Sequence, residues 1–254
     1  MSEFIFGRNP VLEALRSNRP INKILVAKNI DKNLIVQKIT NLAKARGLVV
    51  QQADRRKLNA LANSSSHQGI LALVSPYGYV EIEEILRRAK DKGKDPFIII
   101  LDGIEDPHNL GAILRSAEAG GVDGVVIPKR RSVGLTAVVA KASAGAIEYV
   151  PLSRVTNLSS TLEDLKKQGV WIVGLEMGEK DLWQSDLTGP LALVIGGEGR
   201  GISKKVLKRC DFLVGIPMQG KIPSLNASVA ASLLIFEVAR QRHSLECRIV
   251  NCKL

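Results

Sequence analysis

The sequence predicts an α/β protein in which a small amino-terminal α/β domain precedes a larger domain built on a mostly parallel sheet. Apolar runs of strand length alternate with helical patterns along the whole chain. Turn-forming residues gather between residues 75 and 96, which indicates a domain boundary. The 254 residues are 45% hydrophobic, enough to bury a core in each of two domains. We expect a first domain over residues 1–75, a linker over 76–95 and a second domain over 96–254.

The first domain is predicted from a regular exchange of helix and strand patterns. Asn9 followed by Pro10 is expected to begin a helix, because Asn caps helices and proline suits the first helical position. Further strands are predicted at residues 24–27, 48–50 and 70–74, and further helices at residues 31–46 and 54–62. The linker contains an amphipathic helix between two groups of turn residues, Ser75–Tyr79 and Asp91–Pro96.

The second domain is predicted from six short apolar strands separated by helical segments. The strands are expected at residues 97–101, 124–127, 147–150, 170–175, 191–195 and 212–216. Continuous apolar runs indicate strands that are buried on both faces, as in a parallel sheet covered by helices. In such sheets ligands bind at the carboxyl ends of the strands, so the loops that follow the strands are the candidate site.

Positive charge is concentrated in the first domain. The chain has a formal charge of +11, and residues 1–75 hold 12 basic and four acidic side chains. This concentration predicts a polyanionic partner such as a nucleic acid. Arg8 and the adjacent pair Arg55 and Arg56 are candidates for phosphate contacts, although each is also explained as a solvated surface charge. Aromatic residues make up only 4% of the chain, which argues against a platform that stacks on bases.

The same sequence argues against several other classes of protein. No apolar run approaches the ~18 residues that a membrane span needs. The first ten residues contain Glu3 and lack the pattern of a secretory signal. The three histidines and three cysteines are scattered, without the spacing of a metal site. We therefore expect a cytoplasmic protein with no membrane partner and no metal.

The loop after strand 97–101 leads into a helix that carries a cation. Asn109 is expected to cap this helix, and Arg115 follows on it. Capping and a local ion pair would account for both residues. A basic side chain near the carboxyl edge of a central strand instead favours a functional role for Arg115.

The loop after strand 191–195 is dense in glycine. It runs from Gly196 to Gly201, with Glu198 in its centre. Glycines let a ligand approach the backbone, although a tight structural turn would need them too. The dinucleotide-binding spacing G-x-G-x-x-G fails, because counting from Gly197 the third glycine would fall at Ile202. Phosphate-binding loops of the Walker type are excluded because no Gly-Lys-Ser/Thr follows.

The loop after strand 212–216 again joins a strand to a helix. Ser224 is expected to cap this helix, with Asn226 in its first turn and Ser228 close behind. Hydrogen bonding at the helix start would account for these side chains without a further role. Small residues such as Ala230 and Ala231 recur along the helix, which permits a neighbouring helix or subunit to pack closely.

Taken together, the three loops resemble the signature motifs of the SpoU (TrmH) family of S-adenosyl-L-methionine-dependent RNA ribose 2′-O-methyltransferases, within the SPOUT superfamily. The motifs lie at residues 106–117, 193–201 and 216–230, in the family order, and the resemblance covers about residues 97–243. Residues 1–75 resemble the ribosomal-protein-L30e-like substrate-binding domain of some members. That layout is most similar to members that methylate a guanosine ribose in large-subunit (23S) ribosomal RNA.

The resemblance implies a fold and a set of site residues. The second domain should contain a carboxyl-terminal trefoil knot that holds the methyl donor, and members generally form homodimers through the knotted domain. By position, the cofactor-binding residues are Gly196, Ile216, Met218, Leu225, Asn226 and Ser228. The catalytic set is Arg115 with Asn109, Glu198, Ser224 and Asn226. Arg115 would abstract the proton of the 2′-hydroxyl or, since a guanidinium normally stays protonated, orient a phosphate and stabilise negative charge.

Other functions remain open at this point. A transfer-RNA 2′-O-methyltransferase of the same family would carry the same motifs. A non-catalytic, ribosome-associated RNA-binding protein would explain the charge but not three rich loops at strand ends. A nucleotide-dependent oxidoreductase is disfavoured by the failed dinucleotide spacing.

Overall fold

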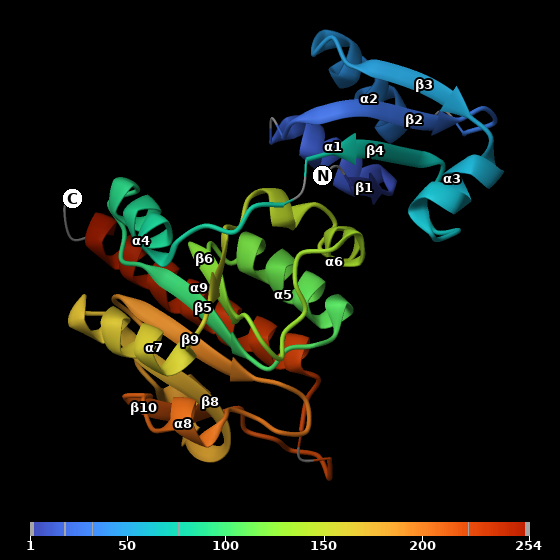
Figure 1. The fold of residues 1–254 in the computed structure, drawn as a ribbon. Coiled ribbons are helices and arrows are strands. Elements are labelled where there is room, and N and C mark those ends of the chain that lie inside the picture. The colour runs from blue at the N-terminus through green and yellow to red at the C-terminus, as the bar shows by residue number, and fades with distance from the viewer. Residues whose placement is uncertain (1–2, 18, 32, 76, 223, 252–254) are drawn as a thin grey trace. The chain divides into compact units, whose positions relative to one another are not determined.

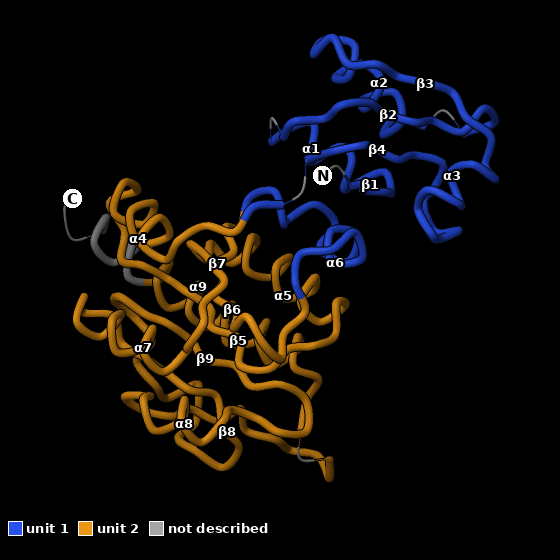
Figure 2. The backbone as a smooth tube through the Cα atoms, in the orientation of Figure 1, with its two compact units in different colours: residues 1–78, 134–149 blue, residues 79–133, 150–254 orange. Residues whose placement is uncertain are grey.

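The computed structural model describes residues 3–17, 19–31, 33–75, 77–222 and 224–251, and the burial of side chains as far as residue 244. The chain is an α/β protein that divides into two compact units (Figures 1 and 2). Unit 1 comprises Met1–Gly78 and Gly134–Tyr149, and unit 2 comprises Tyr79–Val133 and Val150–Leu254. The division therefore does not follow chain order, unlike the boundaries expected from the sequence.

Unit 1 is built on a four-stranded sheet. Its strands are, in spatial order, β1 (Glu3–Phe6), β4 (Ile70–Val74), β2 (Ile21–Ala27) and β3 (Val49–Ala53). β4 runs antiparallel to both of its neighbours, and β2 and β3 are parallel. Three helices of this unit are α1 (Arg8–Arg16), α2 (Leu34–Ala45) and α3 (Arg55–Ala62). The expectation that Asn9 caps α1 is wrong, because the helix begins before it and its N-cap is Gly7, with a φ of 104°.

A segment from the middle of the chain completes unit 1. It contains helix α6 (Ala137–Ala142) and the 3-10 turn η1 (Ala146–Glu148). Glu148 forms a buried ion pair with Arg19 (3.1 Å), whose guanidinium also lies 3.4 Å from the centre of the Tyr77 ring. The strand expected at residues 147–150 is therefore wrong. A short apolar run does not distinguish a strand from another buried segment, and this one packs on unit 1.

Unit 2 is built on a six-stranded sheet in which all strands are parallel. Its strands are, in spatial order, β10 (Phe212–Gly215), β8 (Trp171–Asp181), β9 (Leu191–Gly196), β5 (Phe97–Asp102), β6 (Gly124–Pro128) and β7 (Leu152–Val155). Five of the six strands expected from the sequence are thus confirmed. The remaining strand, β7, begins two residues after the predicted run ends.

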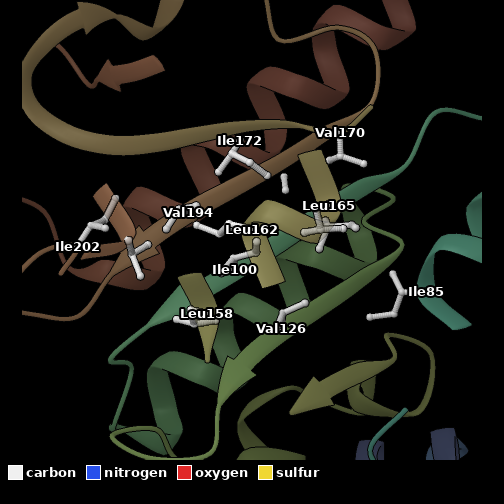
Figure 3. Packing of buried hydrophobic residues seen from close by; sticks show 13 residues of the cluster. Ile85, Ile100, Val126, Leu158, Leu162, Leu165, Val170, Ile172, Val194 and Ile202 are labelled. Carbon is white, nitrogen blue, oxygen red and sulfur yellow. The ribbon is translucent and has the colours of Figure 1, made fainter. Parts of the chain in front are cut away.

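Helices cover this sheet. They are α4 (Ile82–Asp91), α5 (Pro107–Ala119), α7 (Leu158–Lys167), α8 (Lys204–Leu207) and α9 (Ala227–Asn251), together with the 3-10 turn η2 (Leu182–Gln184). Ile85 of α4, Leu162 of α7 and Val206 of α8 pack with strand residues such as Ile100 in one apolar core (Figure 3). α5 and α9 contact each other, and Figure 1 shows them behind the sheet. Because Ile85 is fully buried there, α4 belongs to the core of unit 2 and is not part of a free linker.

The order of the strands identifies where a ligand can bind. From β5 the chain moves to β6 and β7 on one side, and then returns through β8 to β9 on the other. The carboxyl ends of β5 and β9 therefore flank a topological switch point, where open parallel sheets bind their ligands. No helix within the described ranges is both long and apolar enough to span a membrane.

Candidate active site

The loop after β5 leads into α5 through an aspartate cap. Asp106 accepts hydrogen bonds from the backbone nitrogens of His108 and Asn109, each at 3.2 Å. The prediction that Asn109 caps this helix is therefore wrong. Because Asp106 caps the helix, the side chain of Asn109 is free to point elsewhere, and the residue is only 7% exposed. A buried amide of this kind requires hydrogen-bond partners.

The glycines of the loop after β9 are required by close backbone approach. A Cβ atom on Gly196 would lie 2.0 Å from the carbonyl carbon of Gly201, and one on Gly197 would lie 2.2 Å from the carbonyl oxygen of Gly103. The Gly197 nitrogen donates to the Asp102 carbonyl (2.9 Å), and the Gly201 nitrogen donates to the Gly197 carbonyl (3.0 Å). The loop thus folds back on itself and against the loop after β5, and no larger residue fits at either position.

The loop after β10 ends in an asparagine cap. Asn226 directly precedes α9, and its Oδ1 accepts hydrogen bonds from the Ser228 nitrogen (3.0 Å) and the Ser228 Oγ (2.6 Å). The prediction that Ser224 caps this helix is therefore wrong, since Ser224 lies exposed two residues earlier. Asn226 is a strong N-cap residue, and its amide nitrogen remains available for other partners.

One hydrogen-bond network joins the three loops. The Asn226 Nδ2 donates to the Glu198 Oε1 (2.6 Å) and to the Asn109 Oδ1 (3.0 Å). The Asn109 Nδ2 donates to the same Glu198 oxygen (2.9 Å). Each of these residues comes from a different loop, so the structure brings together three of the predicted catalytic residues. Bonds to a carboxylate are charge-assisted and are stronger than bonds between neutral groups.

Arg115 stands apart from this network. It lies on the exposed face of α5, and across the described ranges its guanidinium has no hydrogen-bond or ion-pair partner. A helix residue that is held at its backbone and unpaired at its tip can still reach a bound anion.

The remaining predicted cofactor residues lie on the strand end and loop that follow β10. Ile216 comes directly after that strand and is half-buried, whereas Met218 and Leu225 are 38% and 37% exposed. Ile222 in the same loop is 72% exposed. This apolar surface belongs to a loop that is bonded to the loop after β9, where Gly196 and Gly197 admit no side chain, and exposed apolar groups of this kind suit a ligand with an apolar part.

A further residue, Asp102, was not among those predicted. It ends β5, and its Oδ2 accepts a hydrogen bond from the Ser203 nitrogen (2.8 Å) at the start of α8. The loop after β9 is thereby tied to β5 at both of its ends. An acid at the end of a central strand was the only sequence signal for this role.

Two of the predicted RNA-binding residues, Arg8 and Arg55, lie near the loop that contains His67 and Gln68. The backbone nitrogen of Arg8 donates a hydrogen bond to the Gln68 Oε1 (2.9 Å). His67, next to Gln68, is buried and hydrogen-bonded to Asn59 (2.7 Å). Burial lowers the pKa of His67, and the positive charge of Arg55 lowers it further, so Arg55 also lies near this loop. Arg56 is exposed beside it on α3.

Within the described part of the chain, no group of His, Cys, Asp or Glu side chains could hold a metal ion.

Two family models match the chain. The model described as the SpoU rRNA Methylase family matches residues 96–236. The model described as RNA 2′-O ribose methyltransferase substrate binding matches residues 4–80. The chain belongs to the SpoU (TrmH) methyltransferase family. Its α/β fold with a mostly parallel sheet is therefore that of a SpoU methyltransferase, carrying an amino-terminal substrate-binding domain.

Individual proteins extend this finding. The chain is 48% identical over 242 residues to YacO of Bacillus subtilis (strain 168), and the match covers 95% of this chain and 96% of YacO. The name of YacO places it in the TrmH family of tRNA/rRNA methyltransferases. The crystal structure of the SpoU methyltransferase AviRb from Streptomyces viridochromogenes, solved with the cofactor AdoMet, superposes with a TM-score of 0.80 at 24% identity, covering 96% of this chain and 91% of AviRb. The TrmH/SpoU tRNA-modifying enzyme of A. aeolicus superposes with a TM-score of 0.55 at 26% identity, covering 64% of this chain and 86% of that enzyme.

Proposed function

We propose that this SpoU methyltransferase transfers the methyl group of S-adenosyl-L-methionine to the ribose 2′-hydroxyl of a guanosine in large-subunit (23S) ribosomal RNA. The observation that carries the proposal is the network of Asn109, Glu198 and Asn226. It joins the three family motifs at the topological switch point of the parallel sheet.

The cofactor site is proposed to lie between the loops after β9 and β10. Gly196 is proposed to contribute backbone groups, because a Cβ there would collide with the backbone of Gly201 and disrupt the loop. Ile216, Met218 and Leu225 supply apolar surface for the adenine. When bound, S-adenosyl-L-methionine supplies an electrophilic methyl group. The cap of Asn226 on Ser228 fixes the start of α9, so that this loop keeps one conformation.

The residues of the chain then have separate tasks. The substrate oxygen must lie in line with the methyl group, and this geometry depends on loops that do not move. Asn109, Glu198 and Asn226 hold the loops together, with Ser224 at the mouth of the third loop. Arg115 is proposed to bind the phosphate beside the reacting ribose and to stabilise the negative charge that develops on the 2′-oxygen. Arg8, Arg55 and Arg56 are proposed to hold RNA on unit 1.

We also propose that two copies associate through unit 2, whose carboxyl-terminal segment forms the trefoil knot expected from the family resemblance. Val229 and Phe236 of α9 are 48% and 50% exposed, although they belong to a helix that packs closely against α5. Large exposed apolar side chains on one helix suit a subunit interface. Sedimentation equilibrium tests this point, and a monomer at micromolar concentration would contradict it.

Two measurements test the proposed function. Calorimetry should show heat on addition of S-adenosyl-L-methionine, and its absence would favour a non-catalytic RNA-binding protein. Mapping of 2′-O-methyl groups in total RNA, with and without the protein, should then show a change at one guanosine of 23S ribosomal RNA.

Transfer RNA is the alternative substrate. It is favoured by the name of YacO, which includes both RNA classes. The family model over residues 96–236, however, is described as the SpoU rRNA Methylase family, and the tRNA-modifying enzyme of A. aeolicus matches only 64% of this chain. A methylation change confined to one transfer-RNA position would overturn the ribosomal assignment.

A further inference from the structure

Three consecutive cations follow strand β6 in unit 2. Lys129, Arg130 and Arg131, which we call the basic loop, are all exposed. β6 lies directly beside β5 and runs parallel to it, so the basic loop is at the carboxyl edge of the sheet, next to the loop that begins α5 (Figure 1). A hydrogen bond from the Val133 nitrogen to the Ile104 carbonyl (3.0 Å) joins the two loops. The cations therefore adjoin the proposed active site.

The backbone of the basic loop is held in place while its side chains are not. The Lys129 nitrogen donates to the Val155 carbonyl (2.8 Å), and Arg154 donates to the Lys129 carbonyl (3.0 Å). Ser132 donates to the Pro128 carbonyl. Arg131 has a φ of 58°, a left-handed conformation that is uncommon for residues other than glycine. The loop thus presents its cations from a defined backbone conformation.

The cations of the basic loop have no acidic partners, unlike several other cations of unit 2. Across the described ranges, Lys129, Arg130 and Arg131 form no ion pair. Elsewhere in unit 2, Lys92 pairs with Asp123 and Lys166 pairs with Asp211, at 2.8 and 2.7 Å.

Charge on the neighbouring elements does not neutralise the basic loop. Arg154 of β7 adds a further cation beside it, and the adjoining loop carries two exposed acids, Glu105 and Asp106, of which Asp106 caps α5. Adjacent like charges without partners repel one another, and an anionic ligand would relieve that repulsion. Several cations in a row suit a ligand with repeated anionic groups.

We infer that the basic loop binds backbone phosphates of the RNA strand next to the ribose that is methylated. The inference rests on the proposed function, because that function makes the ligand of this sheet edge an RNA. Lysine and arginine are the usual phosphate ligands, and phosphate contacts position a nucleic acid without reading its sequence. Unit 2 thereby contributes its own RNA contact, separate from the substrate-binding domain of residues 4–80.

The test is a triple variant of the full chain, Lys129→Ala, Arg130→Ala and Arg131→Asn. Asn is chosen at position 131 because it tolerates the left-handed conformation. The matched control is Arg87→Ala, Arg88→Ala and Lys90→Ala, which removes the same net charge from exposed positions of α4. α4 leads into the amino end of β5, at the opposite edge of the sheet.

Binding of an unmodified 23S ribosomal RNA transcript is measured by fluorescence anisotropy over a series of KCl concentrations. Each lost phosphate contact lowers the slope of log affinity against log salt by about 0.7 for single-stranded RNA, so we expect a fall of about 2 in the triple variant. The control variant should keep the slope of the natural chain. An unchanged slope in the triple variant, or an equal fall in the control, would overturn the inference.

Two further measurements separate this inference from the proposed function. Calorimetry with S-adenosyl-L-methionine should give the same affinity in the triple variant as in the natural chain, and the single variant Arg130→Glu should reproduce the loss of RNA affinity at an exposed site. If the natural chain methylates RNA and the variants bind RNA as well as it does, the inference fails and the function stands. If the natural chain transfers no methyl group, the function itself fails.

Discussion

Gly196 offers a sharp test of how the cofactor loop is built. In Gly196→Ala the new Cβ would lie 2.0 Å from the carbonyl carbon of Gly201 and 2.3 Å from the nitrogen of Ile202. Carbon atoms that are not bonded to each other prefer about 3.5 Å, so the backbone at residues 201–202 must shift by about 1.5 Å. That shift would strain the hydrogen bond from Ser203 to Asp102 (2.8 Å).

The expected cost follows from these contacts. Overpacking costs about 1–3 kcal/mol, and one hydrogen bond contributes about 1 kcal/mol. We expect the free energy of unfolding of unit 2 to fall by about 2–4 kcal/mol, and S-adenosyl-L-methionine binding to be lost. Urea unfolding can be followed by tryptophan fluorescence, because Trp171 and Trp183 both lie in unit 2.

The control for this prediction is Gly220→Ala in the loop after β10. A Cβ there meets nothing within 4 Å, and the glycine has no positive φ. We expect its stability to stay within about 0.5 kcal/mol of the natural chain. Unchanged unfolding and unchanged cofactor binding in Gly196→Ala would refute the proposed loop geometry.

Three other predictions address the network, the catalytic arginine and unit 1. Asn226→Ala removes the cap of α9 and two network bonds, so the free energy of unfolding should fall by about 1–3 kcal/mol and methyl transfer should be lost. Asn226→Asp should keep the cap but still lose methyl transfer. Full activity in both variants would contradict the network. Arg115→Ala should lower methyl transfer by about 100-fold or more without changing calorimetric cofactor affinity, and retained turnover would defeat its catalytic role. Because the pKa of His67 is lowered in the folded protein, His67 binds a proton more readily in the unfolded chain than in the folded one. The stability of unit 1 should therefore fall as pH drops below about 6.5, and thermal melts of His67→Gln at pH 5.5 and 7.5 should differ less than those of the natural chain.

Much of the fold follows from local sequence patterns. The strands of unit 2 are continuous apolar runs, because both faces of a parallel sheet are buried, and five of the six were predicted on that basis. The run at residues 147–150 misled the prediction, since Ile147 is buried for a different reason, within unit 1. β1 was missed because Glu3–Phe6 is too short to show a period.

In the candidate site, too, the sequence predicted some features correctly and assigned others to the wrong residues. The motifs predicted that Asn109, Glu198 and Asn226 matter, but helix caps were assigned to the wrong residues in two loops. Ser224, Asp106 and Asn226 are all good capping residues, so the preference for capping does not decide among them. The choice depends on where the backbone turns, which the packing of the loops determines.

The sequence by itself therefore determined the alternation of strands and helices, the concentration of positive charge before residue 76, and the three loops that carry the family motifs. These features depend on neighbours along the chain, where periodicity and turn chemistry act. Only the tertiary structure decided that residues 134–149 complete unit 1, that Asn226 bonds both Glu198 and Asn109, and that the basic loop adjoins the start of α5. Each of these joins residues far apart in the chain, and no local propensity encodes such a contact.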